Sequence, residues 1–368
     1  MKRIQSGSRK VGVVNGDGHV IGLDIGATAV RAAVLAHRRH EGRPRLTGHG
    51  FGEVPLPDGA VVNGNVQDGA AVTDALRRLW QAERFHCRNV VVGVSNPQIV
   101  VRDMTVPAMT PELRARSLPF QARNVIALPV EQVLLDFLPL TEPNEDGTVD
   151  GLLVAAPRQP ILEAVSAVER AGLRVARVDL AALATLRSIA DEHSAVEAVV
   201  DIGAHLTTIV IHDRGVPRVV RTVSRGGREI TDRIADDLGM SLPEAEALKR
   251  EHGLVGRHTE VVRMIREAVR PLIAEIRGSH HYFASNNPTR ALDRMLLTGG
   301  GALLRGLDGA LGDQLGVTTR IVAPTQHVSD VEESGSRGPS DDRAAVSARP
   351  AGSSGSAVSV GLAIGAAA

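Results

Sequence analysis

Two stretches, VIGLDIGATAVRAAVL (Val20–Leu35) and AVVDIGAHLTTIVIHDRG (Ala198–Gly215), decide the fold of this chain. Each contains the tetrapeptide DIGA between two apolar runs. A short apolar run, a glycine-containing turn and a second apolar run predict two strands joined by a tight turn. Because the arrangement occurs twice and further strand and helix signals follow each copy, the sequence predicts two related halves.

Strand and helix signals alternate along the rest of the chain, which indicates the α/β class. Expected strands lie at 20–24, 30–36, 90–94, 99–106, 132–139, 151–155, 198–201, 207–212, 218–224, 295–298 and 318–321. Expected helices lie at 159–171, 181–192, 227–238, 241–251, 260–284 with a kink at Pro271, 302–315, and at the C-terminus.

The composition excludes several function classes. Lys plus Arg and Asp plus Glu both number 42, so no global charge favours nucleic acid or anionic lipid, and aromatic residues make up 2%. The single cysteine, Cys87, excludes an intrachain disulfide framework and a multi-cysteine zinc site. No apolar segment has the length of a membrane span, and no signal peptide is expected at the N-terminus.

The DIGA turns have the chemistry of phosphate-binding turns. Glycine permits close approach of a ligand, and successive backbone N–H groups of such a turn form a concave anion site. An aspartate at its rim can hold Mg²⁺ through water. Thr28 and Thr207 add hydroxyl donors, and the charge of Arg31 can reach a β- or γ-phosphate. One such turn is a common hairpin, but two in matching contexts can hold one polyphosphate from both sides.

Two further motifs follow the second turn. The stretch RMLLTGGGALLRGL (Arg294–Leu307) predicts a strand, a triple-glycine corner and a helix, an arrangement that brings backbone N–H groups to a ligand. Glu246 and Lys249 lie three residues apart on one face of a predicted helix. They form either a solvated ion pair or a pair of contacts to a ribose and a base.

Two Asp-x-Gly turns, a Glu-x-x-Lys helix and a late GGG corner occur in the order typical of the actin-like ATPase superfamily. Within it, the chain most resembles the type IV pilus assembly protein PilM family, which is related to the cell-division protein FtsA. The supporting stretches are VVNGNVQD (61–68), VVVGVSNPQIVVRDMTVPAMTPELR (90–114), ALPVEQVLLDFLPL (127–140) and SRGGREITDRIADDLGMSLPEAEALKREHG (224–253).

The resemblance implies an ATP or ADP site with Mg²⁺. It assigns the first phosphate turn to Asp24, Gly26, Ala27, Thr28 and Arg31, and the second to Asp201, Gly203, Ala204 and Thr207. Adenosine would contact Glu246, Lys249, Gly299, Gly300 and Gly301, while Asp24 and Asp201 would face Mg²⁺ through water. The side chains of His205 and Leu206 narrow the anion-binding site of the second turn and weaken its expected hold on the γ-phosphate. This favours a nucleotide-responsive adaptor over a fast ATPase.

The resemblance also implies a two-lobed, ribonuclease H-like fold with an FtsA-type inserted subdomain. Its expected order is a disordered tail at 1–18, the first lobe at 19–88, the inserted subdomain at 89–178, a return to the first lobe at 179–197, the second lobe at 198–230, a helical cap at 231–293, the second lobe again at 294–328, a disordered loop at 329–357 and a C-terminal helix of the first lobe at 358–368.

The function implied by the resemblance is that of a cytoplasmic adaptor. It would bind the N-terminal cytoplasmic peptide of the inner-membrane protein PilN, and through it the PilN–PilO complex and the pilus motor ATPases. The adaptor would lie at the cytoplasmic face of the membrane without inserting into it. It would hydrolyse ATP slowly or not at all, with His205 as the nearest candidate base. Individual peptide-binding residues are not assigned.

Two alternatives stay open from the sequence. A small-molecule kinase of the same fold needs a base for its acceptor, for which Asp136 is a candidate on an expected strand of the inserted subdomain. A filament protein like FtsA or MreB would self-associate. The C-terminal segment AVSVGLAIGAAA carries no Lys, Arg or aromatic residue, so it is not expected to be a membrane-surface helix.

Overall fold

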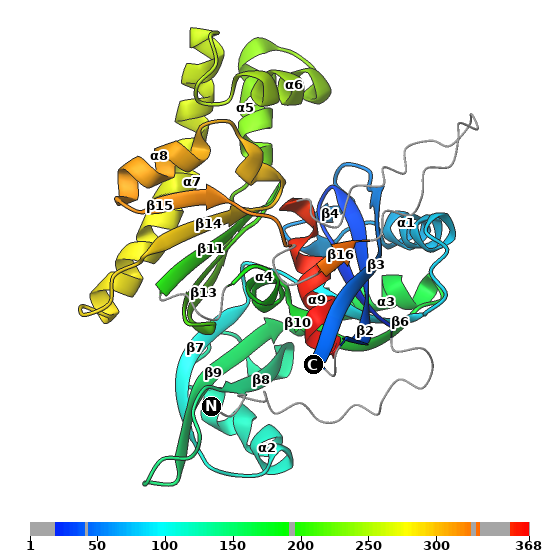
Figure 1. Ribbon diagram of the computed structural model, residues 1–368, viewed down its shortest axis with the longest axis vertical. Coiled ribbons are helices and arrows are strands. Elements are labelled where there is room, and N and C mark those ends of the chain that lie inside the picture. Colours follow the sequence, from blue (N-terminus) through cyan, green and yellow to red (C-terminus); the bar gives the residue numbers. More distant parts are fainter. Residues whose placement is uncertain (1–18, 41–42, 191–195, 325–328, 332–353, 368) are drawn as a thin grey trace. The chain divides into compact units, whose positions relative to one another are not determined.

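The computed structural model describes residues 19–40, 43–190, 196–324, 329–331 and 354–367. These residues divide into two compact units, one formed by residues 98–162 and a larger one formed by residues 19–97 and 163–367 (Figure 1). The predicted tail at 1–18 lies outside the described residues. Among the helices that the structure describes, none combines the length and apolar composition needed to cross a membrane.

The smaller unit is a three-stranded antiparallel sheet with one helix packed on it. Its strands, in the order β7-β9-β8, are β7 (Val100–Pro107), β9 (Thr148–Pro157) and β8 (Val133–Pro139), and the 3₁₀ turn η1 (Val130–Gln132) precedes β8. Helix α2 (Pro111–Ala122) begins at the N-cap Thr110 and buries Leu118 against Phe137 and Leu153. The unit is narrower than the predicted 89–178, because the strands at both ends of that range belong to the larger unit.

The first lobe of the larger unit is built on a six-stranded sheet. Its order is β10 (Arg174–Leu180), β6 (Asn89–Val94), β1 (His19–Ile25), β2 (Ala29–His40), β3 (Arg43–Pro55) and β16 (Ser329–Val331). Helices α1 (Gly69–Ala82) and α3 (Arg158–Arg170) bury apolar residues against one face of this sheet. A small hairpin, β4 (Val61–Val62) and β5 (Asn65–Val66), precedes α1.

The second lobe is built on a five-stranded sheet. Its order is β13 (Val216–Val223), β12 (Thr207–Asp213), β11 (Val196–Ile202), β14 (Arg294–Thr298) and β15 (Thr318–Ile321). The helices of this lobe are α5 (Gly227–Leu238), α6 (Leu242–His252), α7 (Thr259–Asn286) and α8 (Leu307–Leu315). One apolar core joins the sheet to these helices, with Ile202, Ile234, Ile265 and Leu311 among its fully buried members.

The two DIGA stretches have the same topology. β1 pairs antiparallel with β2 and parallel with β6, while β11 pairs antiparallel with β12 and parallel with β14. In each case the aspartate is the second-last residue of the first strand, and a third antiparallel strand, β3 or β13, follows. The predicted repeat is therefore confirmed, and Asp24 and Asp201 occupy equivalent positions in the two sheets.

Two helices complete the core of both lobes. α4 (Ala181–Ile189) contributes Leu186 to a cluster on the second sheet and Ala184 to a cluster with β6 of the first. α9 (Ala357–Ala367), preceded by the 3₁₀ turn η4 (Ser354–Ser356), packs on β1 and β6 beside α4. It approaches β1 so closely that a Cβ on Gly22 would overlap the carbonyl oxygen of Ser359.

Several expected boundaries were wrong. The helix expected at 302–315 begins at Leu307, because residues Gly300–Leu303 form the 3₁₀ turn η2. The helix expected at 181–192 ends at Ile189. The loop expected at 329–357 contains β16 and η4, and its residues 332–353 lie outside the described part of the chain. Helix α7 is confirmed with Pro271 inside it, while the kink there stays a prediction.

The contact between β1 and α9 predicts the effect of two glycine substitutions. Gly22→Ala should lower the free energy of unfolding by about 1–3 kcal/mol, because the added methyl group meets the α9 backbone. Gly309→Ala is the matched control, since a Cβ there meets nothing and lies inside helix α8. The control should be neutral or stabilising by up to about 1 kcal/mol. Equal urea midpoints for Gly22→Ala and wild type would contradict the packing described.

Candidate functional site

The first DIGA turn is organised around Arg31. Its backbone closes through a hydrogen bond from the N–H of Gly26 to the carbonyl of Ala29, at 3.0 Å. Arg31 stands opposite Asp24 in the β1–β2 register, and its Nη1 lies 3.6 Å from Oδ2 of Asp24. Its guanidinium also lies 3.3 Å from Oε2 of Glu53, the residue opposite Arg31 on β3. Arg31 therefore neutralises two nearly buried carboxylates, those of Asp24 and Glu53. Glu53 was not predicted from the sequence as part of this site.

The second DIGA turn is held by the start of helix α5. The N–H of Gly203 donates to the carbonyl of Leu206, at 2.8 Å. The carbonyls of Gly203 and Ala204 accept hydrogen bonds of 2.9 Å from the N–H groups of Gly227 and Arg228. These bonds satisfy two of the donors that a helix N-terminus leaves free. The backbone of the second turn is thus held by hydrogen bonds to helix α5 of the same lobe.

One residue predicted to contact phosphate, Thr207, has its hydroxyl bonded within the protein. The side chain of Thr207 is fully buried, and its hydroxyl donates a 2.8 Å hydrogen bond to the carbonyl of Arg225. The hydroxyl is therefore committed to the backbone that leads into α5. Thr28, which lies within the first turn, is exposed.

The triple-glycine corner packs directly on the second turn. Gly299 has φ = 84°, which favours glycine, and a Cβ there would overlap Oδ1 of Asp201 and the carbonyl of Ile202. Gly227, the first residue of α5, lies between the corner and α6. A Cβ on Gly227 would lie 3.6 Å from Cα of Gly301 and 3.5 Å from Nζ of Lys249. The structure therefore brings the second turn, the corner and the Glu-x-x-Lys helix together.

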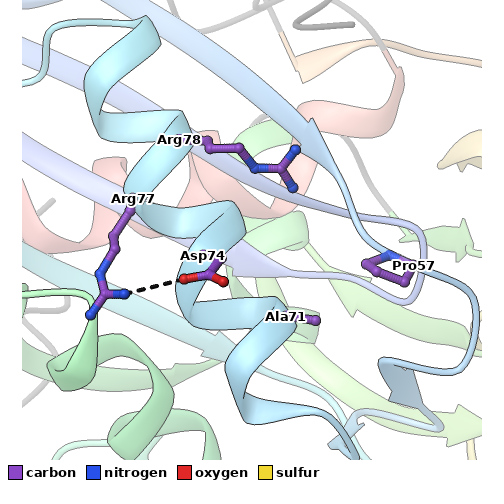
Figure 2. Close-up of a pocket in the computed structure, with 5 residues that line it drawn as sticks. All are labelled: Pro57, Ala71, Asp74, Arg77 and Arg78. Carbon is purple, nitrogen blue, oxygen red and sulfur yellow. Dashed lines mark hydrogen bonds and ion pairs between the residues drawn. The ribbon is translucent and has the colours of Figure 1, made fainter. Parts of the chain in front are cut away.

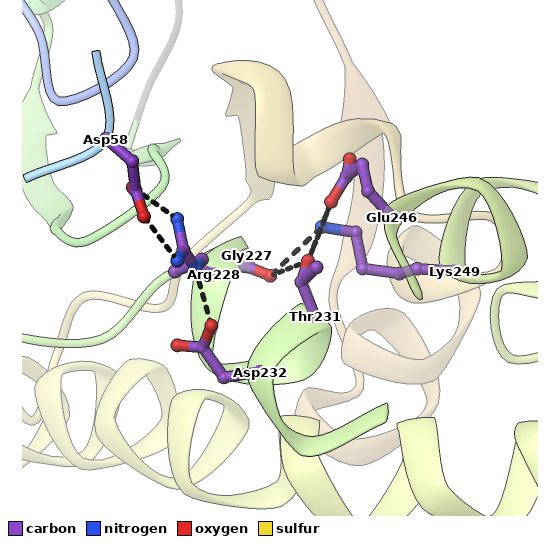
Figure 3. A network of polar contacts seen from close by, with 7 residues as sticks. All are labelled: Asp58, Gly227, Arg228, Thr231, Asp232, Glu246 and Lys249. Atoms are coloured by element: carbon purple, nitrogen blue, oxygen red, sulfur yellow. Dashed lines mark hydrogen bonds and ion pairs between the residues drawn. The ribbon is translucent and has the colours of Figure 1, made fainter. Parts of the chain in front are cut away.

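Glu246 and Lys249 form the predicted ion pair, and two other groups join it (Figure 3). Nζ of Lys249 lies 2.5 Å from Oε2 of Glu246 and donates to the carbonyl of Gly227 and the hydroxyl of Thr231. The Thr231 hydroxyl lies 2.6 Å from Oε2 of Glu246 and donates to it. Burial lowers the pKa of Lys249, and Glu246 opposes this effect. The pair is thus part of a half-buried network at the start of α5.

Asp24 and Asp201 carry the strongest electrostatic conflict of the site. Burial raises the pKa of Asp24, although Arg31 lowers it in part. Burial, and then the negative charge of Asp24, raise the pKa of Asp201 to about 7. The two carboxylates, near the ends of β1 and β11, therefore repel each other electrostatically across the two lobes. Paired buried carboxylates of this kind gain from a bound cation.

The described residues contain no cluster of three or more His, Cys, Asp or Glu side chains suited to hold a metal ion. The two aspartates alone would need further ligands from water and from a bound phosphate.

His205, at the tip of the second turn, has a buried Nδ1 without a hydrogen-bond partner. Asp136, the base considered for a kinase, lies on β8 in the smaller unit and accepts from the N–H of Phe137.

A surface depression of about 520 Å³ lies beside helix α1 (Figure 2). Pro57, Ala71, Asp74, Arg77 and Arg78 line it, and Asp74 and Arg77 form an ion pair at 3.2 Å. None of the residues predicted from the sequence to bind a nucleotide is among these. The depression is therefore separate from the two turns.

Comparison with known proteins identifies relatives over most of the chain. A family model described as type IV pilus assembly protein PilM matches residues 22–339. The cell division protein FtsA of Bacillus subtilis (strain 168) is 27% identical over 55% of this chain and 52% of its own length. FtsA of Streptococcus pneumoniae is 23% identical over 84% of this chain and 76% of its own. The chain thus spans about half the length of the first of these relatives.

Solved structures agree with these relatives. A chain of the PilM–PilN type IV pilus biogenesis complex matches with a TM-score of 0.80 and 26% identity, over 96% of this chain and all of that one. The ethanolamine utilization protein EutJ from Carboxydothermus hydrogenoformans matches with a TM-score of 0.53 and 15% identity, over 94% and 89% of the two chains. The predicted actin-like, two-lobed α/β fold is confirmed.

The pKa of Asp201 predicts how stability changes with pH in metal-free buffer. The unfolded carboxyl loses its proton near its ordinary pKa of 3.8, whereas the folded one keeps it up to about 7. The folded state therefore loses stability from about pH 4 up to about pH 7 and changes little above that, and about 1.4 kcal/mol of the loss falls between pH 6 and pH 8. Asp201→Asn should remove this loss.

The measurement is urea unfolding with EDTA at both pH values, for wild type, Asp201→Asn and a control. Asp74→Asn is that control, since its side chain is 69% exposed on α1. It should keep the wild-type dependence on pH. If Asp201→Asn also kept it, the raised pKa of Asp201 would be disproved.

Proposed function

Since the chain belongs to the family of type IV pilus assembly proteins PilM, we propose that it is a pilus assembly adaptor that binds the N-terminal cytoplasmic peptide of a PilN-like protein. The observation that carries this proposal is the match to the chain of the PilM–PilN complex, which extends over 96% of this chain. The family model, which matches residues 22–339, favours this function over a small-molecule kinase.

The adaptor is proposed to respond to ATP or ADP bound between its lobes. Both DIGA turns, the triple-glycine corner and the Glu246–Lys249 network support this, because they lie around the start of α5 and the facing ends of β1 and β11. Phosphates would contact Asp24, Gly26, Ala27, Thr28 and Arg31 in one lobe and Asp201, Gly203 and Ala204 in the other. Adenosine would contact Glu246, Lys249 and Gly299–Gly301.

Mg²⁺ fits the donors that are present. Asp24 and Asp201 are largely buried carboxylates with raised pKa values, and Gly299 leaves the space beside Oδ1 of Asp201 that a side chain would fill. These two residues would hold the ion through water, and its charge would offset their repulsion and that of the phosphates. Arg31 would then be shared between the carboxylates and the ligand.

Slow ATP hydrolysis, or none, is part of the proposal. Thr207 has no free hydroxyl for the ligand, and Nδ1 of His205 is buried rather than open to an attacking water. The output would instead be a change between the lobes that alters the affinity for the peptide. Links to PilO and the motor ATPases, and a position at the cytoplasmic face of the membrane, would follow through the PilN-like partner.

Titration with the N-terminal peptide of a PilN from the same genome tests the adaptor function. The peptide should bind, and Mg-ATP or Mg-ADP should change its dissociation constant. Absence of binding both with and without nucleotide would overturn the proposal.

A second titration, with fluorescent ADP and Mg²⁺, tests the nucleotide site. Asp24→Ala should reduce Mg-dependent binding at least about a hundredfold, because one of two ionic contacts to the hydrated ion is lost and Arg31 is left to Glu53 alone. Asp74→Ala, on the exposed face of α1, should bind as wild type. Unchanged affinity of Asp24→Ala would refute the assignment of the first turn.

A further inference from the structure

An ion pair joins the two lobes beside the candidate nucleotide site (Figure 3). Asp58 lies in the first lobe, between β3 and the β4–β5 hairpin, and Arg228 is the second residue of α5 in the second lobe. Nη1 and Nη2 of Arg228 donate to the two carboxylate oxygens of Asp58, at 2.6 and 2.8 Å. The two residues are 170 positions apart in the chain.

The geometry makes this pair stronger than an ordinary surface ion pair. The guanidinium contacts the carboxylate through two parallel hydrogen bonds, which add orientation to charge attraction. Nε of Arg228 also donates to Asp232 on the next turn of α5, at 2.5 Å, so the arginine is fixed to its own helix. The side chain of Arg228 is 25% exposed and that of Asp58 is 62% exposed. Arg228 is therefore the partner that its own helix holds in place, whereas the more exposed Asp58 can exchange the ion pair for hydrogen bonds to water.

The pair lies directly behind the second DIGA turn. The N–H of Arg228 donates a hydrogen bond to the carbonyl of Ala204. A displacement of Arg228 would therefore also move the backbone of the second turn. A second contact between the lobes lies nearby, because a Cβ on Gly64 would be 3.5 Å from Cδ1 of Leu206. Both contacts connect the segment from Asp58 to Gly64 with the segment that would hold the phosphates.

We propose that the Asp58–Arg228 pair is a latch that holds the two lobes closed over the candidate nucleotide site, so that a nucleotide enters and leaves only when the pair opens. Contacts between the residues of the two lobes hold the lobes together. A ligand that needs the lobes to part must break two charge-assisted hydrogen bonds on entry and again on release. The latch thus sets the rates of exchange, and this part of the inference rests on the proposed nucleotide binding.

Four variants and one control test the latch. Asp58→Asn and Arg228→Gln remove one charge each, the double variant removes both, and Arg228→Lys keeps the charge but loses the two-bond geometry. Arg233→Gln is the control, because Arg233 pairs at 2.6 Å with Asp237 on the same helix and does not reach the first lobe. Asp58 is exposed in a loop, so its variant keeps the folded core intact.

The first readout needs no nucleotide. Amide hydrogen exchange should become faster in residues 57–64 and 203–206 of the Asp58→Asn and Arg228→Gln variants, because loss of the ion pair lets the contact between these two segments open more often. Arg233→Gln should exchange as wild type in both segments. Unchanged protection in both latch variants would overturn the proposal, whether or not the protein binds a nucleotide.

The second readout is the association and dissociation of fluorescent ADP in a stopped-flow instrument. Both rate constants should rise roughly three- to tenfold in each single variant, and the double variant should be no faster than either. Arg228→Lys should lie between wild type and Arg228→Gln. Faster hydrogen exchange with unchanged ADP rates would overturn the role in exchange. A wild type that binds no ADP would instead contradict the proposed function, and hydrogen exchange would then decide on the latch.

Discussion

In the larger unit, the carboxylates of Asp24 and Asp201 lie close enough for the negative charge of Asp24 to raise the pKa of Asp201. These aspartates are the second-last residues of equivalent strands in two different sheets, and burial raises both pKa values. Arg31 offsets only part of the repulsion, since it also neutralises Glu53. The arrangement costs stability near neutral pH, and a bound cation would offset that cost.

The elements that follow local sequence rules were predictable, and those that depend on tertiary packing were not. The strands around each DIGA turn consist of short β-branched runs, and the structure confirms them. Strand β3 was missed because three glycines interrupt it, yet Gly52 is needed where Leu79 and Glu83 of the α1 region approach the sheet. Helix α2 was missed because Pro119 lies inside it, although Thr110 and Pro111 are typical of a helix start.

The candidate site shows the same division. The Glu246–Lys249 pair follows from a spacing of three residues within one helix, so the sequence is sufficient to predict it. The burial of Thr207 and the contact of Arg31 with Glu53 depend on which face of a strand is covered and on the register between strands. Asp58 and Arg228 carry no local signal for each other, since only the folded chain brings together residues 170 positions apart.

The position of α9 has a consequence for the order in which the molecule forms during synthesis. The second lobe takes its strands and helices from the continuous range 196–321, so all of them have been made before α9 emerges from the ribosome. The first lobe has to wait, because β1 and β6 are covered by Leu362 and its neighbours, more than three hundred residues after β1. The face of the earliest strands that α9 covers therefore stays exposed through most of translation, which leaves the first lobe prone to association until α9 has been made.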